Sequence, residues 1–145
     1  MNDPRKDIEE AISELRRRLK AKEVPDRHLV RVALLALGRV TIEEGDDEAR
    51  PLARDLAGAA EGHEERWEEA FQSEMALAVA ELVHSVDPRY LEMPGYDFAY
   101  TIAARERLEA RLRAAALLQL PVPESLLDQV ATADERLQPY LEGRD

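Results

Sequence analysis

The stretch RHLVRVALLALGRVTIE, residues 27–43, decides the fold of this chain. Wound into a helix, it would be apolar nearly all round, with a thin polar strip of His28, Arg31 and Arg39. Its β-branched residues leave a strand open for part of the stretch, but its length and the lack of period-2 alternation favour a helix. A helix that is apolar on almost every side is usually central, so we expect the other elements to pack around residues 27–43.

Further helices are expected on both sides, and aspartate, proline and glycine mark their ends. Gly58 and Gly62 weaken the third segment, which therefore predicts either one helix or two with a break near residue 62. The expected helices cover residues 4–22, 47–86, 97–120 and 123–137, with a short helical turn at 88–92. About five helices with short connections predict a single all-α domain over residues 1–145, folded as an antiparallel helical bundle.

Composition excludes several classes of function. The 145 residues include no cysteine, which excludes thiol redox chemistry, thiolate metal sites and a disulfide framework. Residues 1–22 are charged throughout and resemble no secretory leader, and the apolar run 29–37 is too short to span a bilayer. We therefore expect a cytoplasmic protein that does not enter a membrane. Abundant alanine and arginine, which have GC-rich codons, favour a bacterial source.

The formal net charge of −11 is unevenly distributed. Residues 41–92 hold fifteen acidic and four basic residues, which accounts for the whole imbalance. Such a surface argues against binding to nucleic acid, because phosphate contacts need clustered lysine and arginine. It leaves open an acidic mimic of nucleic acid, although interspersed arginines weaken that idea. Arginines in 16–18 and 105–113 are expected to pair with this acidity within one chain or across a homo-oligomer.

The first predicted helix carries a narrow apolar seam. Its apolar residues recur at spacings of four, three and four, a pattern typical of helices that associate side by side. We therefore expect the seam to take part in self-association. Its members are Ile8, Ile12, Leu15 and Leu19.

An aromatic-rich connection, residues 90–100, is the candidate partner-binding segment. It holds four of the seven aromatic residues of the chain: Tyr90, Tyr96, Phe98 and Tyr100. Aromatic side chains offer a large contact area at a low cost in conformational entropy, which suits a binding surface. The alternative is that these rings plug the end of the bundle, where the helices diverge.

One pattern suggests a metal site. Glu81 and His84 are three residues apart and so share a helix face, on which Glu74 also lies. Ferritin-like di-iron proteins use a Glu-x-x-His pair on each of two helices, with a further glutamate from each of two others. This chain has a single such pair, so a complete iron or zinc site would need a second copy from another subunit.

Other catalytic patterns are lacking. No serine lies in a Gly-x-Ser-x-Gly turn, and the glycines are too scattered to form a phosphate-binding loop. We therefore expect a non-catalytic, homo-oligomeric interaction or adaptor protein. The alternatives are the ferritin-like metal protein and a small-ligand sensor with a pocket near Trp67.

Overall fold

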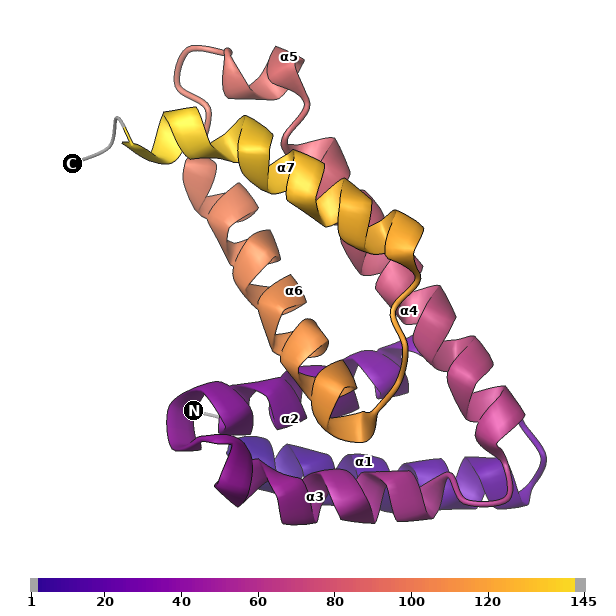
Figure 1. The fold of residues 1–145 in the computed structure, drawn as a ribbon. Coiled ribbons are helices and arrows are strands. Elements are labelled where there is room, and N and C mark those ends of the chain that lie inside the picture. Colours follow the sequence, from indigo (N-terminus) through magenta and orange to yellow (C-terminus); the bar gives the residue numbers. More distant parts are fainter. Residues whose placement is uncertain (1–2, 143–145) are drawn as a thin grey trace.

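A computed structural model describes residues 3–142, which are helical apart from turns and contain no strand (Figure 1). The helices are α1 (Pro4–Lys20), α2 (Arg27–Glu44), α3 (Asp46–Ala59), α4 (Glu64–Ser85), α5 (Pro88–Leu91), α6 (Phe98–Leu118) and α7 (Glu124–Glu142). The expected all-α class is confirmed.

The number of helices exceeds the expected five, because these residues form seven. The expected segment 47–86 is two helices, since the chain turns at residues 60–63, where Gly62 has a φ of 84°. The short turn after Asp87 is a helix of its own, α5. The last helix, expected over about 123–137 with a possible extension through Tyr140 and Leu141, continues to Glu142 and contains Pro139.

Aspartates cap four of the helices, as their positions before the helical patterns indicate. Asp3, Asp26, Asp87 and Asp97 each accept a hydrogen bond from a backbone N–H in the first turn, at 2.9–3.0 Å. Such caps satisfy N–H groups that have no partner inside the helix and typically stabilise it by about 1 kcal/mol each. These helix starts are therefore set by local sequence.

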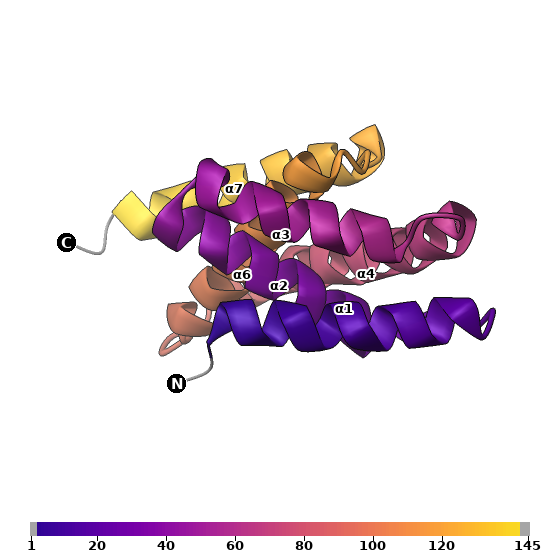
Figure 2. The same cartoon turned by 90° about the horizontal axis from the view of Figure 1, so that it is seen from below.

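The helix α2 is central, as its apolar sequence predicts. It packs against α1, α3, α4 and α6, while α7 packs on α4 and on the short α5. Figure 1 shows α1, α2 and α3 together at one end of the molecule, with α4, α6 and α7 extending from them. In the view from below, α1 and α3 lie on either side of α2 (Figure 2).

The helices α2 and α6 approach each other very closely at Gly38. A Cβ built on Gly38 would lie 2.1 Å from the carbonyl oxygen of Ala110, so only glycine fits there. The two backbones meet directly, and Ala110 is itself only 4% exposed. This contact fixes where α6 crosses α2, and thereby which side of α6 faces α4.

The helix α4 supplies much of the rest of the core. Its largest buried apolar residues form one stripe: Trp67, Phe71, Met75, Val79 and Leu82. Burying a side chain of this size is worth about 1.5–3 kcal/mol. Within residues 3–142, every helix is too short or too polar to cross a membrane.

Candidate functional site

The apolar seam of α1 faces the interior of its own chain. Ile8, Ile12, Leu15 and Leu19 are each at most 7% exposed, and α1 packs on α2 and α3. Their side chains are covered before any second copy could reach them. The spacing that suggested association between chains is explained by association between helices of one chain.

The aromatic segment forms a packed corner where α4 ends and α6 begins. We call it the aromatic corner (Tyr90, Tyr96, Phe98 and Tyr100). The Tyr96 hydroxyl lies 3.0 Å from the carbonyl oxygen of Ser85 and 2.7 Å from the Thr101 hydroxyl. These bonds tie the connection after α5 to the last turn of α4. The corner is thus held in place by polar contacts as well as by ring packing.

Three of the four predicted aromatic residues belong to a chain of ring contacts. Tyr96 lies between Tyr90 and Phe98, with ring centroids 6.4 and 5.2 Å away, and Phe98 stacks on Tyr140 of α7. Tyr100 stands outside this chain and is 55% exposed. Three of the rings therefore pack at this end of the helices, as the plug alternative expects, whereas Tyr100 is left exposed.

The structure brings the three residues of the metal hypothesis to one groove. Glu74, Glu81 and His84 all line a hollow of about 430 Å³ between α2, α4 and α6. Each carboxylate there accepts a hydrogen bond from a guanidinium, Glu74 from Arg111 at 3.1 Å and Glu81 from Arg107 at 2.9 Å. Within residues 3–142, no three histidine or acidic side chains are grouped as metal ligands. Both carboxylates are therefore engaged by guanidinium groups, and the metal hypothesis gains no support from their arrangement.

We call this hollow the arginine groove, because arginines dominate its charge. Its lining is Arg27, Arg31, Glu74, Leu77, Ala78, Ala80, Glu81, His84 and Arg111. Arg27 lies four residues before Arg31 on α2, and like charges at that spacing repel each other. Arg27 approaches Glu74 only to 3.9 Å, and Arg31 forms no hydrogen bond or ion pair within the described part of the chain. Two arginines therefore have no carboxylate of their own.

Arg111 is the buried member of the groove. Its side chain is 4% exposed and Glu74 is 5% exposed, so both groups have lost most of their water. Burial lowers the pKa of Arg111, an effect that Glu74 opposes and the charge of Arg31 reinforces. The Nε atom of Arg111 is buried without a hydrogen-bond partner. The groove thus leaves a buried donor unsatisfied, which is rare in folded proteins.

The sequence did not indicate that Arg27 and Arg31 share a groove with Glu74. The signal that was present is the i, i+4 spacing of two arginines on the polar strip of an otherwise apolar helix. The expected pairing with residues 41–92 occurs for Arg107 and Arg111. Arg105 instead bonds Asp134, and Arg113 lies 3.5 Å from Glu109, both outside that segment. These pairs need no second subunit.

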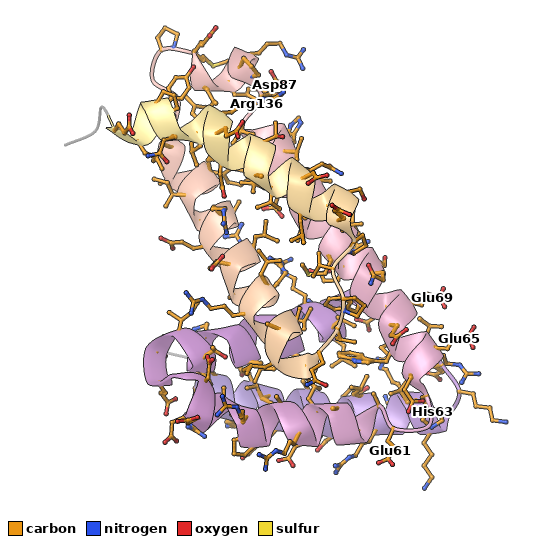
Figure 3. The ribbon with its side chains drawn as sticks, viewed as in Figure 1. Glu61, His63, Glu65, Glu69, Asp87 and Arg136 are labelled. Carbon is orange, nitrogen blue, oxygen red and sulfur yellow. The ribbon has the colours of Figure 1, made fainter. Side chains whose placement is uncertain are left out.

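Exposed acidic residues around the start of α4 occupy a separate surface. Figure 3 shows Glu61, Glu65 and Glu69 around the start of α4, remote from the aromatic corner in the ribbon of Figure 1. They are exposed and form no ion pair with the described residues. Trp67, proposed to border a ligand pocket, is 4% exposed and belongs to the core.

Comparison with known proteins adds nothing to this geometry: no protein-family model, curated protein or solved structure matches the chain. The function is therefore argued from the two surfaces described above, the aromatic corner and the arginine groove.

Proposed function

We propose that this protein is a non-catalytic interaction protein that binds a partner protein at the aromatic corner. The observation that carries the proposal is the 55% exposure of Tyr100 beside rings that are packed and hydrogen-bonded. An exposed tyrosine on a rigid base loses little entropy on binding, and tyrosine is enriched among the residues that dominate interface energies. Met93, 51% exposed, adds a second apolar contact in the same connection.

The charges around the corner indicate the chemistry of the partner. Glu92 and Asp97 are exposed and form no ion pair with another described residue, while the nearby Asp87 is already paired with Arg89 at 2.8 Å. The corner therefore has unpaired negative charge beside exposed apolar surface. A partner segment with an apolar side chain flanked by lysine or arginine complements both properties.

Site-specific photo-cross-linking tests this proposal. A photoreactive residue replaces Tyr100 in the full chain, and a matched control carries it at Leu127 on α7, which is 44% exposed. We expect a discrete protein adduct from position 100 that position 127 does not form. An adduct of twice the chain mass would identify a second copy as the partner, in line with a homo-oligomer.

Binding of the purified partner then decides whether the corner supplies the affinity. Tyr100→Ala should weaken binding at least about tenfold, as expected for an anchor residue, without changing the melting temperature. Equal adducts from positions 100 and 127, or unchanged affinity in Tyr100→Ala, would contradict the proposal.

A further inference from the structure

The arginine groove has a surplus of positive charge inside an acidic protein. The chain carries a net charge of −11, yet each carboxylate of the groove already has its own guanidinium. Asp26, which lines an adjoining hollow with Arg27 and Arg31, lies 3.6 Å from Arg18. Arg27 and Arg31 therefore remain as two cations without an anion of their own.

This arrangement of positive charges is energetically unfavourable. Arg27 and Arg31 repel each other along α2, Arg31 also disfavours the charge of Arg111, and the buried Nε of Arg111 has no acceptor. The two charge repulsions would fall if an anion lay beside Arg27 and Arg31. The buried Glu74 supplies one negative charge to two guanidiniums, those of Arg111 and Arg27, and Arg31 has none.

The groove also has an apolar part beside the arginines. Leu77 is 44% exposed and lines the hollow together with Ala78 and Ala80. Its volume of about 430 Å³ falls within the range of small-molecule sites, which combine apolar lining with a few fixed polar groups. Guanidinium groups suit oxyanions because their N–H groups form a planar fork that matches carboxylate and phosphate oxygens.

We propose that the arginine groove binds a small organic oxyanion, a carboxylate or phosphate ester. The oxyanion contacts Arg27 and Arg31 and lies next to the buried Glu74–Arg111 pair, and the organic portion packs on Leu77. The groove adjoins the aromatic corner, because the Tyr100 hydroxyl lies 3.5 Å from Glu81 and Tyr90 packs on His84. The proposed anion site nevertheless involves the other end of the groove, at Arg27 and Arg31, and does not rest on the proposed partner protein.

Titrations with phenyl phosphate and with benzoate test the proposal and distinguish the two oxyanions. Both are followed by ¹H–¹⁵N NMR of the backbone and of arginine Nε–H groups, against sodium chloride at the same ionic strength. We expect saturable shifts at Arg31, Leu77 and Arg111 with at least one probe, at concentrations up to about 10 mM. Shifts that only follow ionic strength would overturn the site.

Matched variants show whether binding occurs in the groove. Arg31→Gln should weaken binding at least about tenfold, because it removes a charge-assisted bond, whereas Arg16→Gln should not. Both arginines are exposed and have no ion pair within the described residues, so neither change should lower the melting temperature.

A second pair of variants leaves the arginines intact. Leu77→Glu places a negative charge in the groove, and Leu127→Glu places one on α7 at an equal exposure of 44%. Weakened binding in Leu77→Glu alone supports the site. Equal affinities in Arg31→Gln and Arg16→Gln, or in Leu77→Glu and Leu127→Glu, would overturn it.

Discussion

Two neighbouring residues of α6 make opposite kinds of contact. Ala110 meets Gly38 of α2 backbone to backbone, with no room for another carbon atom. Arg111, one residue later, extends to Glu74 of α4 and buries an ion pair. The first contact consists only of small groups in close packing, and the second removes two charges from water.

The two contacts differ in what they contribute to stability and to binding. Close packing of small residues gains dispersion energy and sets the position of α6. A buried ion pair usually contributes little net stability, because desolvation offsets the attraction between the charges. The charged contact is therefore weak evidence for stability, and its place in the arginine groove agrees with a role in binding. The predictions below test this division.

Breaking the buried pair should have the largest effect. Arg111→Met leaves Glu74 buried with Arg27 at 3.9 Å, and we expect the free energy of unfolding to fall by about 3–5 kcal/mol. The double variant Glu74→Leu, Arg111→Met should lose less than either single variant. Urea denaturation measures all three, and a double variant less stable than both singles would show that the pair itself stabilises the fold.

Adding a methyl group at the close contact of α2 with α6 should cause the second-largest loss of stability. Gly38→Ala forces a methyl group against the backbone of Ala110, and overpacking of this kind costs about 3 kcal/mol. Gly58→Ala is the control, because Gly58 is helical and has open space around it. That change should instead stabilise the protein by about 0.5–1 kcal/mol. Equal effects of the two substitutions on the urea midpoint would contradict the close approach of α2 and α6.

Removing a hydrogen-bonded hydroxyl group should cause the third-largest loss of stability. Tyr96→Phe removes a hydroxyl that bonds Ser85 and Thr101, and the expected loss is about 1 kcal/mol. Tyr100→Phe removes a hydroxyl that lies 3.5 Å from Glu81 at the surface, and should change stability by less than about 0.5 kcal/mol. Thermal unfolding compares the two, and a larger loss from Tyr100→Phe would show that the exposed ring has a structural role.

Removing an exposed ion pair should have the smallest effect on stability, and that effect should depend on pH. Hydrogen bonds from Arg89 lower the pKa of Asp87 to about 2, from 3.8. A carboxyl with a lowered folded-state pKa stabilises the fold above its unfolded pKa and loses that contribution as pH falls through about 2. The stability difference between the wild type and Asp87→Asn should therefore be constant above pH 3.8 and shrink below it. A difference that grows on acidification would contradict this assignment.

Local features of the sequence account for most of the correct predictions. The caps at Asp3, Asp26 and Asp97 act between residues two or three apart, so the chain itself specifies them. The predicted break near residue 62 follows equally from local backbone freedom at Gly62. The segment 47–86 remained ambiguous because glycine weakens a helix without always ending it.

The candidate sites were less accessible to sequence reasoning. The placement of Glu74, Glu81 and His84 on one face was correct, because helical spacing alone determines it. Their neighbours were missed, because Arg111 is 37 residues from Glu74 and comes from another helix. The same limit explains why the seam on α1 suggested a second chain: its spacing shows that something covers it, but not what.

By itself, the sequence determined that this chain is helical, where most of its helices begin, and that residues 27–43 lie at the centre. Periodicity and capping decide these features, because they act over a few residues. Only the tertiary structure decided that Gly38 meets Ala110, that Arg111 reaches Glu74, and that Tyr100 stays exposed while Tyr96 is tied down. These outcomes depend on the angles and positions at which whole helices pack, which no short stretch of sequence specifies.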